Sequence, residues 1–278
     1  MATVKKRQKR APVQLFPTNA QKAYTSALIA IVNNVERLIK THVFPQIDPI
    51  LNQARLHRPT TDAIKTDYFS DQIEQSINKA ESEIDSLHPD SQLEKTAFSV
   101  ALLIVTHNKR EVTKVLSAIK GIAVQDVFLV EPFLDTEVSL FVKQNIKLIK
   151  TIPNQLFRET EGIVFRGIQQ GLSHTTIKKH LAERIEINRN RAKLIARDQT
   201  GKLNAQLTQL RQQSVGVKRY IWRTVGDERV RGNPVGRYSG ATPSHFSREG
   251  KTFKWASPPN DGHPGQPIQC RCYAEPIL

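Results

Sequence analysis

The chain has 278 residues, of which 38% are hydrophobic, 6% aromatic and 24% charged. This composition predicts a folded protein whose core is mostly aliphatic. The longest apolar run, residues 98–105, is too short to span a bilayer, and the N-terminal segment is basic rather than apolar. We therefore expect neither a membrane protein nor a secreted disulfide scaffold, and the two cysteines favour a reducing compartment.

The formal net charge of +15 is unevenly distributed along the chain. Residues 1–10 hold five basic side chains and no acidic one, whereas residues 11–149 hold 14 basic and 16 acidic ones. The net charge of residues 150–215 is +7, and that of residues 216–278 is +5. This distribution favours contact with a polyanion such as DNA, and a solvated basic surface without a partner is the alternative. The candidate electrostatic contacts in the tail are Lys5, Lys6, Arg7, Lys9 and Arg10.

Apolar residues at helical spacing predict helices in the first half of the chain. A first helix is expected from Thr18 to Pro45, a second over 61–87 and a third over 93–119. No cluster of catalytic residue types lies in these segments. We expect residues 17–133 to form a helical bundle or hairpin.

The helical pattern continues into the second half. A fourth helix is expected over 134–170, where Pro153 should kink or split it. Ser173 is expected to cap a short helix over 175–183, and a last helix is expected over 188–213.

Turn residues replace the helical pattern after residue 216. A strand is predicted over 218–224, with Tyr220 and Trp222 on one face, and residues 271–278 can form a closing strand. Many Gly and Pro residues lie between the two strands. The expected fold class is α+β, with a predominantly helical N-terminal and central region followed by a small Gly/Pro-rich α+β module.

This organisation predicts three parts. Residues 1–16 are expected to be a disordered basic tail, and residues 17–133 a helical region. Residues 134–278 are expected to form a C-terminal domain, helical over 134–215 and made of short strands and turns over 216–278.

Four motifs follow one another in the C-terminal half. They are RAKLIARDQ (191–199), YIWRTVGDERVR (220–231), PSH (243–245) with GKTFKW (250–255), and PPNDGHPGQ (258–266) leading to Cys270-Arg271-Cys272. In this order they resemble the Mu F-like phage head morphogenesis proteins, also called minor head or minor capsid proteins, over about residues 135–278. Two departures from the family pattern are Asp198-Gln199, where the family usually has Thr-Glu, and an apparent insertion over 232–242.

The resemblance implies a structural protein of a phage or prophage rather than an enzyme. Such a protein is expected in the virion head interior, and in the host cytoplasm during assembly. Its implied partners are the portal protein, capsid or scaffold components and packaged DNA, with residues 17–133 docking on the portal. The family-motif residues expected to build the C-terminal core are Arg197, Trp222, Asp227, Arg229, Arg231, Trp255, Pro259 and Gly265.

Cys270 and Cys272, with His245 and His263, are candidate zinc ligands. Residues i and i+2 of a strand share one face, and thiolate with imidazole suits tetrahedral zinc. However, Cys-x-Cys is not the usual Cys-x2-Cys spacing. The alternative is two small buried residues that pack a Pro-rich turn, and a disulfide between them would be strained.

Two other functions stay open. A metal-dependent nuclease or toxin-like hydrolase would use Asp227, His245 and His263. Against it, the neighbouring Arg229 and Arg231 fit structural ion pairs with Asp227. The second alternative is a non-specific DNA-binding protein unrelated to virions, which the basic tail and the basic last helix motivate.

Overall fold

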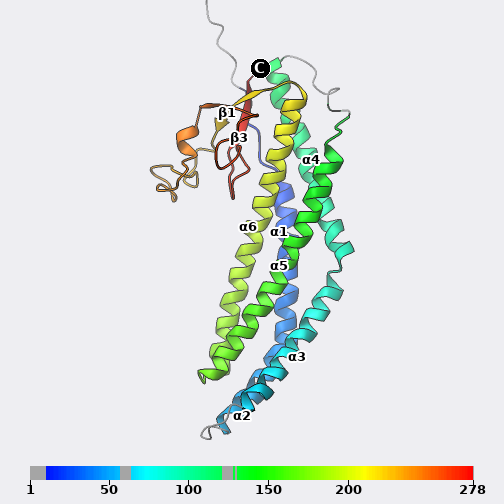
Figure 1. The fold of residues 1–278 in the computed structure, drawn as a ribbon, viewed down its shortest axis with the longest axis vertical. Coiled ribbons are helices and arrows are strands. Elements are labelled where there is room, and N and C mark those ends of the chain that lie inside the picture. The colour runs from blue at the N-terminus through cyan, green and yellow to red at the C-terminus, as the bar shows by residue number, and fades with distance from the viewer. Residues whose placement is uncertain (1–10, 57–63, 121–127, 129, 278) are drawn as a thin grey trace, which may run out of the picture. The chain divides into compact units, whose positions relative to one another are not determined.

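The computed structural model describes residues 11–56, 64–120, 128 and 130–277. Helices make up most of this part of the chain, and a small antiparallel sheet follows them (Figure 1). The predicted α+β class is therefore confirmed. The α-helices are α1 (Thr18–Leu38), α2 (Phe44–Leu56), α3 (Ile64–Leu87), α4 (Asp90–Lys120), α5 (Leu134–Gln169) and α6 (His174–Ser214).

Pro45 does not end the first helical segment, contrary to the expectation. Helix α1 passes into a π-helical turn, η1 (Ile39–Val43), and α2 begins at Phe44. Pro45 thus lies at the second position of α2, directly after the π-helical turn, and the chain stays helical through it. The apolar stripe continues through this junction, because Val43 and Ile47 are both fully buried.

Helix α5 covers the predicted range, and α6 is longer than either of the two helices predicted there. Pro153 lies inside α5 and does not split it. Helix α6 is one helix of 41 residues, where two were expected. Ile185 and Ala192 are buried and carry the apolar stripe across the predicted break. The predicted cap is confirmed, since Ser173 Oγ accepts a hydrogen bond of 3.1 Å from the Thr176 N–H.

The sheet consists of β1 (Arg219–Arg223), β2 (Thr252–Lys254) and β3 (Tyr273–Ile277) in the order β2-β1-β3. Both pairings are antiparallel, with Tyr220 opposite Phe253 and Trp222 opposite Ala274. Tyr220 and Trp222 are buried on one face, as predicted. Strand β2 was not predicted, because three residues among Gly and Pro give no readable alternation.

The chain divides into two compact units, each assembled from segments that are distant in the sequence. Unit 1 comprises Met1–Gln21, Phe98–Phe141 and Arg197–Leu278, and unit 2 comprises Lys22–Ala97 and Val142–Ala196. The sheet and all the C-terminal turns belong to unit 1.

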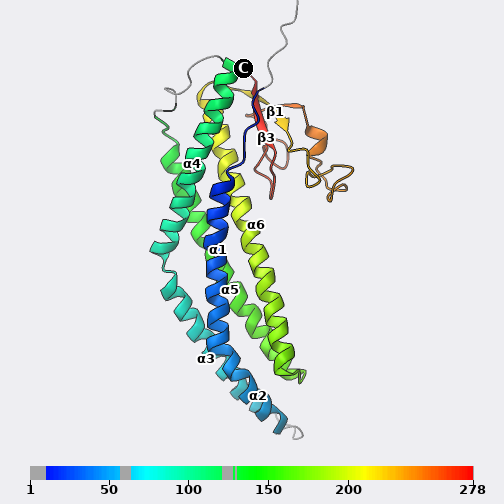
Figure 2. The ribbon, with the colours of Figure 1, turned by 180° about the vertical axis from the view of Figure 1, so that it is seen from behind.

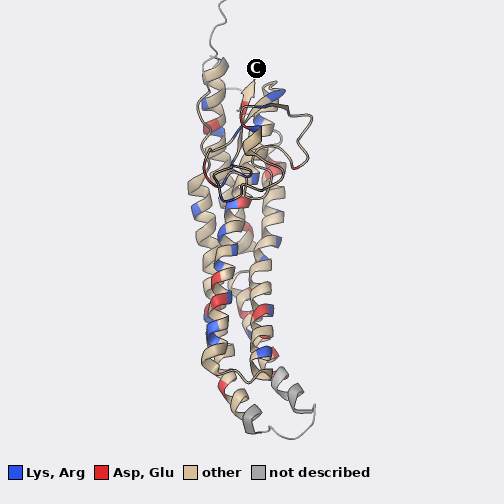
Figure 3. Cartoon of the chain, turned by 90° about the vertical axis from the view of Figure 1, so that its left-hand side faces the viewer, with Lys and Arg blue, Asp and Glu red and all other residues tan. Residues whose placement is uncertain are grey.

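Unit 2 consists of helices, and polar side chains connect helices that are distant in the sequence. Helices α2 and α3 lie side by side in both views of the ribbon (Figures 1 and 2). The Tyr24 hydroxyl donates a hydrogen bond of 2.6 Å to Asn145 Oδ1, and both residues are fully buried. Arg189 forms an ion pair with Glu36. Basic and acidic positions are interspersed along the helices (Figure 3), which suits such pairing.

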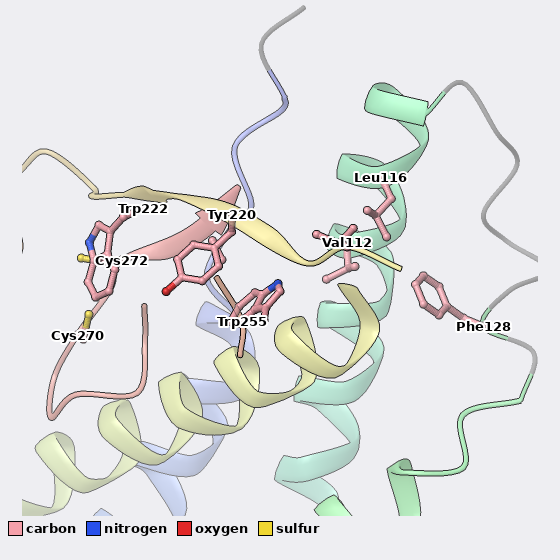
Figure 4. Packing of buried hydrophobic residues seen from close by; sticks show 10 residues of the cluster. Val112, Leu116, Phe128, Tyr220, Trp222, Trp255, Cys270 and Cys272 are labelled. Carbon is pink, nitrogen blue, oxygen red and sulfur yellow. The ribbon is translucent and has the colours of Figure 1, made fainter. Parts of the chain in front are cut away.

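The core of unit 1 joins α4 to the sheet. Val112 and Leu116 of α4 belong to one buried cluster with Tyr220, Trp222 and the two cysteines (Figure 4). The Gln212 amide fastens helix α6 to the sheet. Gln212 Oε1 accepts a hydrogen bond of 3.2 Å from the Trp255 indole, and Gln212 Nε2 donates one of 2.9 Å to the Ala274 carbonyl.

Candidate metal centre

Three of the four predicted zinc ligands converge inside unit 1. His245 Nδ1 lies 3.4 Å from Cys270 Sγ and 3.7 Å from Cys272 Sγ. The ligand atoms of the three residues all lie within 4.8 Å of one another, and the three side chains are buried. Figure 4 shows both sulfur atoms beside the Trp222 ring. Two sulfurs and one imidazole nitrogen therefore face a common point.

The backbone around this point brings separate segments together. The N–H groups of His245 and Phe246 both donate to the Arg231 carbonyl, which holds the histidine loop against the second motif. Cys270 follows a turn in which its N–H donates to the Pro267 carbonyl at 3.0 Å. Cys272 comes directly before β3. The Cys-x-Cys spacing thus places both sulfurs beside the sheet.

Gly265 supports the cysteine loop, and only glycine fits its position. Its φ of +87° is in the left-handed region, and a Cβ there would lie 2.7 Å from Cβ of Ala205 in α6. The Gly265 N–H also points to Cys270, with 3.4 Å between nitrogen and Sγ. The family-motif glycine therefore both packs the loop on α6 and donates to the sulfur.

A carboxylate orients the histidine. His245 Nε2 lies 2.9 Å from Asp261 Oδ2, and Asp261 Oδ1 lies 2.7 Å from Arg248 Nη1 in an ion pair. The Arg248 guanidinium also lies over the Trp222 ring, 4.8 Å from its centroid. When Nε2–H donates to Asp261, the neutral ring directs the Nδ1 lone pair to the two sulfurs.

The surroundings shift the pKa values of Cys270, Cys272 and His245 away from their ordinary values. The neighbouring Cys272 thiol and His245 hold the pKa of Cys270 below its ordinary value, although burial opposes this. The nearby Cys270 sulfur and burial raise the pKa of Cys272. Burial opposes charging of His245, but Cys270 and Asp261 raise its pKa nonetheless. These surroundings thus make Cys270 the more acidic of the two thiols.

His263, the fourth predicted ligand, has a different partner. Its Nδ1 lies 2.8 Å from the Tyr220 hydroxyl, and its ring packs edge-on against Trp255 with centroids 4.8 Å apart. Burial lowers the pKa of His263. It is not part of the group of ligand atoms around His245, and it instead braces the aromatic core.

Asp227 also lies in a separate cluster. Its carboxylate pairs with Arg271 and accepts a hydrogen bond of 3.1 Å from the Arg229 N–H. Burial opposes its ionisation, but these contacts hold the pKa of Asp227 below its ordinary value. Among the described residues, Asp227, His245 and His263 do not form a group able to hold a metal. The geometry therefore gives the hydrolase alternative no assembled site.

The remaining family-motif residues have structural contacts. Arg231 Nη2 donates to the Ile268 carbonyl at 2.6 Å, and the Pro259 carbonyl accepts from the Gly262 N–H at 2.8 Å. Trp222 and Trp255 are buried, so they are core aromatics and present no stacking surface for bases. Five predicted contacts in the basic tail lie outside the described residues: Lys5, Lys6, Arg7, Lys9 and Arg10.

Arg197 lies in a positively charged neighbourhood. Burial lowers its pKa, the nearby Arg271 and Arg229 lower it further, and Asp227 acts in the opposite direction. This motif arginine therefore belongs to the cluster around Asp227.

The contacts of two carboxylates were not predicted from the sequence. Asp261 stands inside the motif over 258–266, but nothing in the spacing pairs it with His245. Asp198 Oδ1 accepts a hydrogen bond of 2.8 Å from the N–H of Gln269, whose φ is +60°. Asp198 is one of the two departures from the family pattern, and here it stabilises the turn before Cys270.

The motifs lie in a region that matches a known family. Residues 159–275 match the family model described as phage Mu protein F like protein. These residues are therefore a Mu F-like domain, within the 135–278 range that the motifs indicated.

A relative from Haemophilus influenzae (strain Rd KW20), described as an uncharacterized protein, is 33% identical over 189 residues. The match covers 68% of this chain but only 40% of that protein, so the chain spans less than half the length of its relative. No solved structure matches the chain.

Proposed function

We propose that this chain acts in phage head morphogenesis as a minor head protein that contacts the portal and the packaged DNA. The observation that carries the proposal is the Mu F-like domain over 159–275. Polar side chains of its motifs form ion pairs and hydrogen bonds within the domain, as the pairing of Asp227 with Arg271 illustrates. A folded module with these internal contacts suits a structural role in the head. No described helix is long and apolar enough to cross a membrane.

We assign portal docking to residues 17–133 and the Mu F-like domain to residues 134–278. Within the first range, Phe98 and Leu102 lie one turn apart on α4 and are 46% and 45% exposed. Neighbouring exposed apolar side chains support a protein interface. We assign DNA contact to the basic tail, residues 1–10, because an uncompensated basic segment binds backbone phosphates without reading sequence.

Quantitative mass spectrometry of purified particles tests the assignment to the head. We expect the chain in DNA-filled heads, at a constant ratio to the portal protein and at far lower copy number than the major capsid protein. Absence from heads and from their assembly intermediates would overturn the proposal.

Co-purification with the portal protein tests the docking surface. The full-length variant with Phe98→Ser and Leu102→Ser should lose the portal and keep its helical circular dichroism. The matched control is Ile187→Ser, which removes an apolar side chain that is 53% exposed but lies outside the docking region. If both variants retain the portal equally, the docking surface is elsewhere. If the wild-type chain does not bind the portal, portal contact itself is wrong.

A further inference from the structure

We propose that Cys270 Sγ, Cys272 Sγ and His245 Nδ1 bind a zinc ion. This site goes beyond the role in head assembly and does not depend on it. Two thiolates and an imidazole are a soft ligand set that zinc prefers over magnesium or calcium. The three ligand groups are already convergent and buried.

The spacing of the ligand atoms matches a tetrahedral ion. Zinc binds sulfur at about 2.3 Å and imidazole nitrogen at about 2.0–2.1 Å, which places a sulfur and a nitrogen about 3.5 Å apart across a tetrahedral angle. The two observed separations, 3.4 Å and 3.7 Å, lie on either side of that value. Both sulfurs also approach the same nitrogen atom. One Nδ1–H can point at only one sulfur at a time, whereas one cation satisfies both.

The surroundings are those of a metal-bound histidine. Metal-ligating histidines usually donate their second ring N–H to a carboxylate or a carbonyl, which fixes the tautomer. Asp261 occupies that place on His245 at 2.9 Å, and Arg248 holds Asp261 in turn. The Gly265 N–H points to Cys270 Sγ, as donors to thiolate ligands do. The ligands and the groups that orient them are therefore both present.

The charges of the ligands suit a divalent ion. Two thiolates neutralise the charge of one zinc ion, so the bound site carries no net charge in its buried position. A disulfide is the other way to consume both thiols, but closing one across a single residue strains its geometry. Among the described residues, these three side chains supply the ligands.

The ion would join two segments that are separate along the chain. His245 stands in the loop before η3 (Phe246–Arg248), and Cys270 and Cys272 lie in the loop that leads directly into β3. Their module contains strands of only five, three and five residues. Small modules with little regular structure often depend on a metal for stability. The zinc ion therefore acts as a structural cross-link of the Mu F-like domain.

Metal analysis of the full-length protein, purified reduced and without chelators, tests the site directly. We expect about one zinc per chain. Replacement by Co²⁺ should give a sulfur-to-cobalt charge-transfer band in the near ultraviolet. The Cys270→Ser and Cys272→Ser variants should lose most of this band. The matched control is His263→Gln, which changes a buried histidine outside the cluster and should retain zinc and the band.

A further variant tests the orienting carboxylate. Asp261→Asn should keep the cobalt spectrum but weaken zinc binding by about 10- to 100-fold in a competition titration. Wild-type protein settles the question even if the cysteine variants fail to fold. Two titratable thiols with neither zinc nor a cobalt band, or a Cys270–Cys272 disulfide found after anaerobic purification, would overturn the proposal.

Discussion

Arg211 and Glu131 form a two-point ion pair in the interior of unit 1. Arg211 Nε lies 2.6 Å from Glu131 Oε1, and Nη2 lies 3.0 Å from Oε2. The arginine side chain is fully buried, and its Nη1 also donates to Asn108 Oδ1 at 2.6 Å and to the Val105 carbonyl at 3.2 Å. This pair connects α6 to α4 and to the segment before α5. No sequence pattern distinguishes Arg211 from the exposed basic residues of α6.

Removing one partner of this pair should destabilise unit 1 strongly. Arg211→Met leaves the buried Glu131 carboxylate with only the more distant Lys109 ammonium, 3.9 Å away, so the free energy of unfolding should fall by about 3–5 kcal/mol. Urea denaturation monitored by tryptophan fluorescence measures this, since Trp222 and Trp255 both lie in unit 1. The control is Arg237→Gln, because Arg237 pairs with Glu228 on the surface. It should change stability by less than about 1 kcal/mol. Equal effects of the two variants would contradict the buried pair.

Two glycines of α5 should respond in opposite directions to the same substitution. A Cβ on Gly167 would lie 2.6 Å from Ile177 Cγ1, so Gly167→Ala should cost about 1–3 kcal/mol by overpacking. A Cβ on Gly162 meets only the flexible end of Arg166 at 3.0 Å, and Gly162→Ala should stabilise the helix by about 0.5–1 kcal/mol. Thermal unfolding followed by circular dichroism distinguishes them. The packing of Gly167 on Ile177 is wrong if its variant melts at or above the wild-type temperature.

Stability near neutral pH should depend on His88 in unit 2. Burial lowers the pKa of His88, and Asn34 Nδ2 lies 2.9 Å from its Nε2, where it donates to the neutral ring. The unfolded chain, with a pKa of about 6.5, therefore takes up a proton before the folded one does. The stabilisation from His88 is present above that pKa and is lost as the pH falls through the lower folded value.

Denaturation of wild type and His88→Gln at a series of pH values from neutral to mildly acidic measures this effect. The stability of the wild type should fall relative to the variant as the pH drops below about 6.5. A constant difference between the two proteins across this range would show that His88 titrates alike in both states.

The basic tail should dominate the salt dependence of DNA binding. Replacing its five basic residues by Gln should reduce the slope of log K against log salt by about 0.9 for each phosphate that the variant no longer neutralises. Fluorescence anisotropy with duplex DNA at several salt concentrations gives the slope. The control replaces five exposed lysines of the charge-balanced segment: Lys22, Lys79, Lys95, Lys143 and Lys147. If the tail variant keeps the wild-type slope, the DNA contacts lie elsewhere on the chain.

The parts of this fold that depend on local periodicity could be predicted from the sequence. The apolar stripes located the helices, and the alternation around Tyr220 and Trp222 located β1. Errors arose where packing overrides a local signal. Pro45 and Pro153 are helix breakers in isolation, yet both lie within helices. The predicted break in α6 was wrong because the buried Ile185 and Ala192 keep the same face in register.

The residue types of the candidate metal site could be predicted from the sequence, but their contacts in space could not. Cys270 and Cys272 stand out because the chain has two cysteines, whereas His245 is one of eight histidines. His263 has the same chemistry, and only the fold shows that it pairs with Tyr220 instead. Asp261 is one of 26 acidic residues, and no spacing rule connects it with a histidine 16 positions away. Contacts between irregular loops produce no repeating pattern of residues from which they could be predicted.

The discontinuous make-up of unit 1 has a consequence for its synthesis. Its three segments are separated by the long stretches that build unit 2, and β3 follows the other described elements along the chain. Strand β1 pairs with β3 along its whole length, and Gln212 reaches the Ala274 carbonyl only when β3 is in place. The helices of unit 2 can associate during translation, whereas unit 1 closes only after residue 277 has emerged from the ribosome. Until then its apolar cluster is exposed, so this interval is when the nascent chain is most prone to aggregate or to require a chaperone.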